Sequence, residues 1–351
     1  MGLIQVWANL ARHAPHLANS VLRFEPLASI GKRWAGITTQ RELPSFAPET
    51  FTVWVRHRKA SPKGGRKVLL WPDTFTNHFE PAVAKAAMQV LEAADCSVSV
   101  PETAVCCGRP LYEYGMLGRA RDYARRNLEI LRREIRAETP LIVLEPSCLS
   151  VFKDEMVSLF PDDPGATKLA QNCYSFSDFL TNEMDYHPPS LNKAALTHGD
   201  CHQKAFDGIE SELRLLQRAG VRAEALDSGC CGLAGSYGYE ADRYDISMKI
   251  AEHVLLPKVR ESGPDSLIVS SGFSCRSQIA HGSGRAALHP AQVIQMALRR
   301  NGAAVLELPE RQQKKRRMAS GSTASIAAGI AVTAAIAGLA VLRYQHSARL
   351  G

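Results

Sequence analysis

No two of the nine cysteines in this chain are spaced as CxxC. Zinc knuckles and ferredoxin-type iron–sulfur runs take neighbouring ligands from that spacing, so neither kind of site is encoded here in its usual form. The N-terminus also lacks the continuous apolar core that a signal peptide carries. We therefore expect the cysteines to stay reduced, which favours metal ligation or redox chemistry over a disulfide framework.

The chain has little excess of positive charge outside one basic run. The formal net charge is +7, but the segment RQQKKRR at 311–317 alone carries five positive charges. The remainder is nearly balanced, and no RNA- or DNA-binding module is recognisable, so we expect no nucleic-acid partner. A length of 351 residues with 45% hydrophobic and 22% charged residues is enough for two globular domains.

Strand and helix patterns alternate from residue 67 onward. Short apolar runs predict strands at 67–72, 96–101, 140–146, 193–200, 221–226 and 265–271. Helical periodicity predicts helices at 80–94, 118–138, 210–220 and 240–259. This alternation predicts an α/β fold in which helices cover the faces of parallel sheets.

The triplet CCG occurs twice, at 106–108 and at 230–232. Cys107 and Cys231 are 124 positions apart, and Cys148 and Cys275 are 127 apart. The pair at 73–74 (Asp-Thr) lies 127 positions before the pair at 200–201 (Asp-Cys). We infer an internal duplication of a domain of about 125 residues, which is too long for a solenoid repeat.

The domain organisation follows from this duplication. We expect two cysteine-rich domains at 67–160 and 193–300, separated by a linker at 161–192. A helical lead-in and linker precede them at 1–66, and a basic linker follows at 301–323.

Residues 324–342 form a stretch of 19 residues without a charged side chain, and the basic run KKRR precedes it. As a helix it would span roughly 28 Å, so we expect a transmembrane helix, with an alanine-rich extension as the alternative. Basic residues favour the cytoplasmic side. This predicts a location on the cytoplasmic face of the cell membrane, with a single C-terminal anchor.

Each repeated cysteine follows a predicted strand, and ligands of parallel sheets bind beyond the carboxyl ends of the strands. The second half should bring together four thiolates, Cys201, Cys230, Cys231 and Cys275. The first half offers three, Cys106, Cys107 and Cys148, with Thr74 in the place of Cys201. Adjacent cysteines diverge, so they suit a polynuclear iron–sulfur centre better than one zinc ion. Gly229 and Gly232 would let the backbone approach it.

Other residues near these positions have open roles. Cys96 and Cys173 are expected to be small buried residues without a ligand role. Four histidines are either core or surface residues, or donors to the centre: His198, His202, His281 and His289. Arg109 and Arg276 either raise the potential of a cluster or are solvated. Four tyrosines are expected to pack in the core: Tyr112, Tyr114, Tyr237 and Tyr239.

Six segments together resemble the CCG cysteine-rich domain family: WPDTFTNHF, CCGRPLYEYGML, EPSC, GDCHQKA, DSGCCGLAGSYGYE and GFSCRSQIAH. The resemblance covers roughly residues 40–300. The domain occurs twice in one of the subunits of heterodisulfide reductase, and also in the iron–sulfur subunits of glycolate oxidase and related dehydrogenases. The chain resembles most the C-terminal iron–sulfur part of FAD-linked oxidases. It departs from the family pattern at Val151 and Gln278, where a second cysteine of CxxC is expected.

The resemblance implies two Rossmann-like domains that bind iron–sulfur clusters, of the 4Fe–4S type and in some members noncubane. It implies that the seven repeated cysteines are cluster ligands. The implied function is electron transfer from a flavin-linked dehydrogenase of a 2-hydroxy acid, such as lactate or glycolate, towards quinone. FAD would lie on a partner chain, a flavin-containing dehydrogenase subunit, and a ferredoxin-type iron–sulfur subunit is a further implied partner.

Two other functions stay open. One is a thiol or disulfide redox enzyme similar to heterodisulfide reductase. The other is a truncated, non-redox scaffold that binds zinc or no metal. In the favoured reading the chain is an oxidoreductase subunit or module without its own flavin domain.

Overall fold

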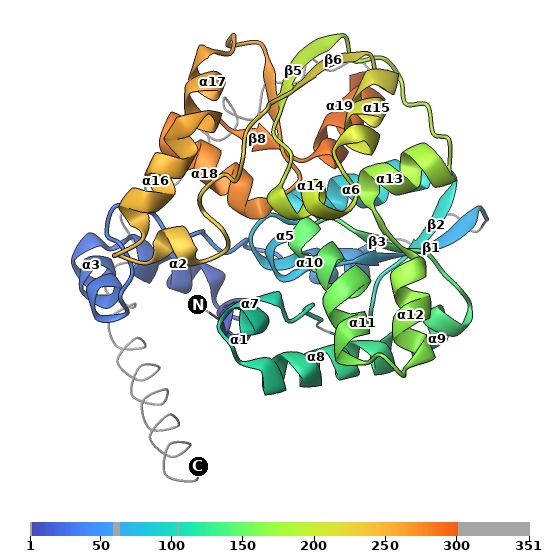
Figure 1. Ribbon diagram of the computed structural model, residues 1–351, viewed down its shortest axis with the longest axis horizontal. Helices are drawn as coiled ribbons and strands as arrows, with labels where there is room; N and C mark the ends of the chain where they lie inside the picture. Colours follow the sequence, from blue (N-terminus) through green and yellow to red (C-terminus); the bar gives the residue numbers. More distant parts are fainter. Residues whose placement is uncertain (1, 59–63, 104, 301–351) are drawn as a thin grey trace.

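The structure, a computed structural model, describes residues 2–58, 64–103 and 105–300. It contains two four-stranded parallel sheets, ordered β2-β1-β3-β4 and β6-β5-β7-β8 (Figure 1). The strands of the first are β1 Arg66–Trp71, β2 Cys96–Ser99, β3 Leu141–Val143 and β4 Cys173–Ser175. Those of the second are β5 Lys193–Thr197, β6 Val221–Ala225, β7 Leu267–Val269 and β8 Ala287–Leu288. The predicted α/β fold with a duplicated, Rossmann-like domain is confirmed.

The central strands show why these apolar runs form buried strands. In β1, Val68 and Leu70 face one hydrophobic core, while Leu69 and Trp71 face another. β1 pairs with β2 on one side and with β3 on the other, in parallel register. Because successive side chains point to opposite faces, a strand covered on both sides must be apolar throughout.

The helices of the first half surround its sheet. They are α5 Thr74–His78, α6 Pro81–Ala93, α7 Arg109–Glu113, α8 Leu117–Ile130, α9 Arg132–Arg136, α10 Pro146–Ser150, α11 Met156–Leu159, α12 Pro164–Gln171 and α13 Phe176–Asp178. Two π-helical turns continue α10 and α13, at Val151–Glu155 and Phe179–Glu183.

The second half repeats this order. Its helices are α14 Cys201–Phe206, α15 Glu210–Arg218, α16 Tyr244–His253, α17 Leu255–Glu261, α18 Phe273–Ser283 and α19 Pro290–Arg300. A short 3₁₀ turn, Tyr237–Tyr239, precedes α16. The predicted helix at 240–259 is divided at Val254, whose backbone leaves the helical region.

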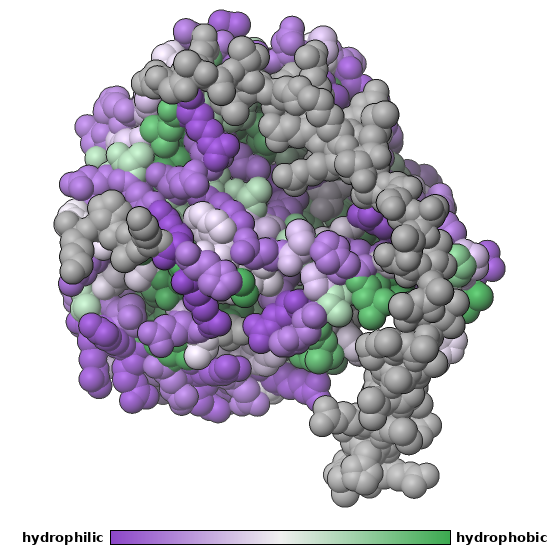
Figure 2. All heavy atoms as spheres, turned by 180° about the vertical axis from the view of Figure 1, so that it is seen from behind, coloured by the Kyte–Doolittle hydropathy of each residue, from purple (hydrophilic) through white to green (hydrophobic). Residues whose placement is uncertain are grey.

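One hydrophobic core joins the two sheets. Its buried members come from both sheets and from α6, α13, α15 and α19, and α6 packs against α19 (Figure 1). Two further cores cover the outer faces, one over the first sheet and one over the second. The side of the molecule shown in Figure 2 is largely hydrophilic outside its grey atoms, with small separate hydrophobic patches. Most of the buried apolar side chains therefore belong to the three cores.

The segment 161–192, predicted as a linker, contributes to the first sheet. It contains α12, β4 and α13, and β4 pairs with β3 through Leu141, Ile142 and Val143. Strands β4 and β8 have only three and two residues. Runs this short carry too little periodicity for the sequence to predict them.

The lead-in packs against both halves. It contains α1 Ile4–Ala11, α2 Pro15–Arg23, α3 Glu25–Trp34 and α4 Phe51–His57. Helix α1 contacts α5 of the first half. The Arg41 guanidinium donates to the carbonyl of Gly238 (2.8 Å) and to Ser247 Oγ (3.2 Å) in the second half.

The predicted membrane anchoring is corrected. The longest described helix, α8, has 14 residues, whereas a transmembrane helix needs about 20. Within residues 2–58, 64–103 and 105–300, no helix is both long and apolar enough to cross a membrane. This finding overturns two predictions, the transmembrane helix and the location on the cytoplasmic face of the membrane. The segment on which they rested, 324–342, lies outside the described residues.

Candidate metal centre

Four cysteines converge at the carboxyl end of the second sheet, as predicted from their positions after strands. Cys201 begins α14 after β5, Cys230 and Cys231 lie in the loop after β6, and Cys275 lies in the first turn of α18 after β7. Their thiols form a chain of hydrogen-bonded neighbours, Cys201 to Cys230, Cys230 to Cys231 and Cys231 to Cys275. The four thiols therefore form one row of neighbours at this end of the sheet.

The surroundings of Cys230 favour a thiolate. Hydrogen bonds from Cys201 and Cys231 lower its pKa, and the Gly232 N–H donates to its sulfur at 3.3 Å. The pKa of Cys231 is raised by its hydrogen bonds with Cys230 and Cys275 and by burial. N–H donors to sulfur are a common way in which a protein tunes an iron–sulfur centre.

This group opens to the surface on one side. Cys201 is exposed and Cys230 is half-buried, whereas Cys231 and Cys275 are buried. Beside Cys230 lies a cleft of about 350 Å³, between the loop at 228–230 and helix α16. A bound group would therefore be reachable from solvent through one face.

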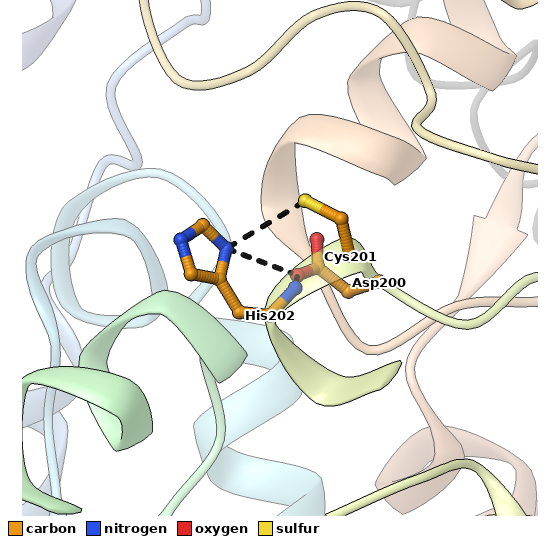
Figure 3. Close-up of side chains that lie close together, drawn as sticks. All are labelled: Asp200, Cys201 and His202. Carbon is orange, nitrogen blue, oxygen red and sulfur yellow. Dashed lines mark hydrogen bonds and ion pairs between the residues drawn. The ribbon is translucent and has the colours of Figure 1, made fainter. Parts of the chain in front are cut away.

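Asp200 and His202 flank Cys201. Asp200 caps α14 by accepting from the His202 N–H (2.9 Å), and its other carboxylate oxygen accepts from Cys275 Sγ (3.2 Å). Figure 3 shows the His202 ring facing both neighbours, with Nδ1 3.4 Å from Asp200 Oδ1 and 3.7 Å from Cys201 Sγ. One possible ligand atom from each of these three residues lies within 4.8 Å of the other two.

The four candidate histidines divide into two pairs. His198 is buried next to Cys230, bonds Ser228 Oγ through Nδ1 (2.8 Å), and has its pKa lowered to about 4 by burial. Its Nε2 has no hydrogen-bond partner among the described residues. His202 borders the same group. By contrast, His281 bonds Tyr244 (3.0 Å), and His289 is buried against the Leu144 carbonyl (3.2 Å).

The first cysteine group is enclosed. Cys106, Cys107 and Cys148 are 6%, 3% and 4% exposed. The sulfurs of Cys107 and Cys148 lie 2.8 Å apart, and Cys106 is hydrogen-bonded to Cys107. Thr74 is buried beside Cys106, where Cys201 stands in the second half. As predicted, this half offers three sulfurs rather than four.

The backbone conformation explains why the third residue of each CCG triplet is glycine. Gly108 has φ +91° and Gly232 has φ +85°, a left-handed conformation that favours glycine. A methyl group on Gly232 would lie 2.3 Å from the Ser247 carbonyl oxygen. Gly229 has open space around it, so it is not required in the same way.

The tyrosines after the triplets do not all pack in the core. Tyr239 is 7% exposed, but Tyr112 and Tyr114 are 39% and 40% exposed. The Tyr114 hydroxyl bonds Ser236 Oγ (2.8 Å) and Glu240 (3.1 Å), and so ties the two loops together. The prediction of core packing is wrong for Tyr112 and Tyr114.

Neither candidate arginine is solvated. Arg109 forms ion pairs with Glu113 (2.9 Å) and Glu155. Arg276 is 4% exposed and pairs with Glu80 (2.6 Å) of the first half. It also donates to the carbonyls of residues 270 and 271. Both charges are therefore neutralised locally.

A set of four buried carboxyl groups was not predicted from the sequence, and three of them lie near Cys148 or Cys275. Its members are Asp73, Glu145, Asp200 and Glu212. Glu145 accepts from the Phe273 N–H (2.8 Å), and burial and then Asp200 raise its pKa to about 8. The sequence carried one signal, since an aspartate precedes both Thr74 and Cys201.

The two groups differ in how well they fit an iron–sulfur cluster. The second provides four neighbouring thiols, a backbone donor to sulfur, a His198 Nε2 without a partner among the described residues, and an open side. The first provides three buried sulfurs, two of them at 2.8 Å. The residues of the second half fit the group, and those of the first half do not.

Comparison with known proteins identifies the family of the chain. The family model of the CCG cysteine-rich domain matches residues 73–153 and 198–280, one match in each half. Lactate utilization protein A of Bacillus velezensis is 32% identical over 183 residues, which are 49% of this chain and 74% of that protein.

Two other relatives are longer matches. A subunit of the anaerobic glycerol-3-phosphate dehydrogenase of Escherichia coli is 26% identical over 289 residues, 80% of this chain and 72% of that protein. D-2-hydroxyglutarate dehydrogenase of Escherichia coli is 22% identical over 311 residues, 83% of this chain and 29% of that protein. With a matched domain in each half, the chain belongs to the CCG cysteine-rich domain family.

Proposed function

We propose that the protein is the iron–sulfur electron-transfer component of a flavin-linked dehydrogenase. The observation that carries this proposal is the convergence of four thiols at one end of the second sheet. The names of the relatives support it, because they include a dehydrogenase subunit, a lactate utilization protein and a dehydrogenase.

Within this proposal, a partner chain oxidises the substrate. The substrate is a small 2-hydroxy acid such as lactate or glycolate, and the partner holds FAD. A ferredoxin-type subunit is the second partner, and a quinone is the final acceptor. The relatives act on hydroxy compounds by their names, which is consistent with this substrate class.

A 4Fe–4S cluster, cubane or noncubane, would accept and release electrons when bound. Cys201, Cys230, Cys231 and Cys275 would hold it. The Gly232 N–H, which donates to the Cys230 sulfur, would stabilise negative charge there. Asp200 holds α14 and Cys275 together, so it positions ligands from two elements.

The proposal is tested on protein purified without oxygen. We expect about four iron and about four sulfide per chain and an EPR signal in one redox state. Cys230→Ser should lose most of this iron because it removes the thiol with the lowered pKa. The matched control is Cys173→Ser, because Cys173 is buried in β4 and no cysteine of either group is among the groups that affect the pKa of its thiol. Iron-free wild-type protein that resists reconstitution, or equal iron loss in both variants, would refute the proposal.

A second candidate function is thiol or disulfide reduction. The exposed Cys201 and the cleft beside Cys230 favour it, because a substrate disulfide needs access to the centre. Disulfide reductase activity with an artificial electron donor would support this function. Activity that persists unchanged in Cys231→Ser would count against it.

A further inference from the structure

The first cysteine group contains a pair of thiols close to bonding distance. Cys107 Sγ and Cys148 Sγ lie 2.8 Å apart, compared with about 2.05 Å in a disulfide bond. Cys107 lies in the loop before α7, and Cys148 lies in α10, so the contact joins two separate elements. The pair is therefore brought together by the fold and not by adjacency in the chain, unlike Cys106 and Cys107.

The space around this pair is filled. Both residues belong to the hydrophobic core on the outer face of the first sheet, which also contains Trp71, Leu149 and Phe152. The corresponding group in the second half has an exposed member, Cys201, and a cleft beside it. A bulky inorganic centre would have to displace core side chains in the first half, whereas a bond between two sulfurs needs no added volume.

The charges near the first group also favour a neutral state, and Asp200 and Glu145 lie near Cys275 of the second group in the same way. Asp73 and Glu145 lie near Cys148, and both add to the cost of a negative charge there. Thiolates holding a cluster would place further negative charge in this buried region, which is costly without a partner. A disulfide is neutral. Thr74 beside Cys106 supplies no fourth sulfur, which also disfavours a cluster in the first half.

We propose that Cys107 and Cys148 are a reversible dithiol–disulfide pair rather than cluster ligands. The oxidant is a small two-electron oxidant of the peroxide class. The two thiols lose two protons and two electrons as the Sγ–Sγ bond forms, and hydrogen peroxide takes them up as its O–O bond breaks to give two water molecules. A dithiol reductant reverses the step.

The proposal is independent of the cluster in the second half. Acid denaturation releases cluster-bound thiols, so they react with an alkylating agent afterwards, whereas a disulfide survives. The experiment treats the full chain with hydrogen peroxide and then alkylates it with N-ethylmaleimide in acidic and then neutral denaturant. Tryptic peptides 86–119 and 137–153 contain Cys107 and Cys148 respectively. We expect them to be cross-linked, with fragmentation placing the bond on these two residues.

Controls make the outcome specific. Cys106→Ser leaves the pair intact and should keep the cross-link, because Cys106 is the neighbour and not a member. Cys148→Ala should abolish it, and circular dichroism shows whether this variant still folds. The wild-type result needs no variant, so misfolding of Cys148→Ala would not affect the test.

Two results would overturn the proposal. One is complete alkylation of Cys107 and Cys148 after peroxide treatment under conditions that oxidise a free cysteine in a reference peptide. The other is a cross-link to Cys106 or Cys96 in place of Cys107. The iron content of aliquots taken before peroxide is added reports on the second half separately, so failure of the cluster proposal and failure of the disulfide proposal are distinguishable.

Discussion

Thr74 and Cys201 occupy equivalent places in the two halves. Each is the first residue of a short helix, α5 or α14, and each follows an aspartate that caps the helix. Asp73 accepts from the backbone N–H groups of residues 75 and 76, and Asp200 accepts from that of residue 202. The two halves therefore share this backbone geometry and differ in whether it presents a hydroxyl or a thiol.

The first prediction uses this equivalence. Cys201→Thr gives the second half the ligand set of the first half, with three sulfurs. We expect the iron content of anaerobically purified protein to fall at least several-fold, because the exposed ligand that completes the set is lost. Iron and sulfide assays measure this directly.

Thr74→Ser is the matched control, since it keeps a hydroxyl at the equivalent position. Its iron content should equal that of the wild type. Unchanged iron in Cys201→Thr would show that Cys201 is not a ligand.

Much of the site could be predicted because a duplication aligns residues that are far apart in the chain. The equivalence of Cys107 with Cys231 and of Cys148 with Cys275 follows from counting, and parallel sheets bring such residues to one edge. The pairing of Cys107 with Cys148 could not be predicted, because it depends on how α10 packs against the CCG loop. The charged partner of Arg276, Glu80, comes from the other half, and no local sequence pattern predicts this contact.

The second prediction concerns the glycines around Cys230 and Cys231. Gly232→Ala should lower the free energy of unfolding by about 1–2 kcal/mol from its left-handed backbone alone. The contact of the new methyl group with the Ser247 carbonyl adds to this cost. We also expect less iron, because the backbone shift moves the N–H that donates to Cys230. Urea unfolding and iron assays measure both effects.

Gly229→Ala is the comparison for this variant. Its position has open space and no left-handed φ, so stability should be unchanged or slightly higher. Equal destabilisation by the two substitutions would contradict the assignment of Gly232 as the constrained position.

The third prediction concerns the contact between the halves. Arg276→Gln should lower the free energy of unfolding by about 1–3 kcal/mol, the range for leaving buried polar groups without their hydrogen-bond donor. The Arg276 side chain is 4% exposed and its loss leaves two carbonyls and Glu80 without their donor. Glu80→Gln should cost less, because the Glu80 side chain is 34% exposed. A cost below about 1 kcal/mol for Arg276→Gln would refute this role.

The last prediction is a pH dependence carried by His289. Burial, and then the nearby positive charge of Arg276, lower its pKa from 6.5 to about 3. Its Nε2–H donates to the Leu144 carbonyl, and Nδ1 accepts from the Ala291 N–H, so the folded protein holds the neutral ring. Below pH 6.5 the unfolded chain binds a proton that the folded chain does not.

The sign follows from this difference in bound protons. The contribution of His289 to stability is fully present above pH 6.5 and is lost as the pH falls towards 3. Between pH 7.5 and pH 5, the loss from this residue is about 2 kcal/mol, at 1.36 kcal/mol per pKa unit. Urea unfolding of His289→Gln, whose amide can replace both hydrogen bonds, should therefore show a smaller loss of stability over this range than the wild type. Parallel pH curves for the two proteins would show that His289 is protonated in the folded state as readily as in the unfolded chain.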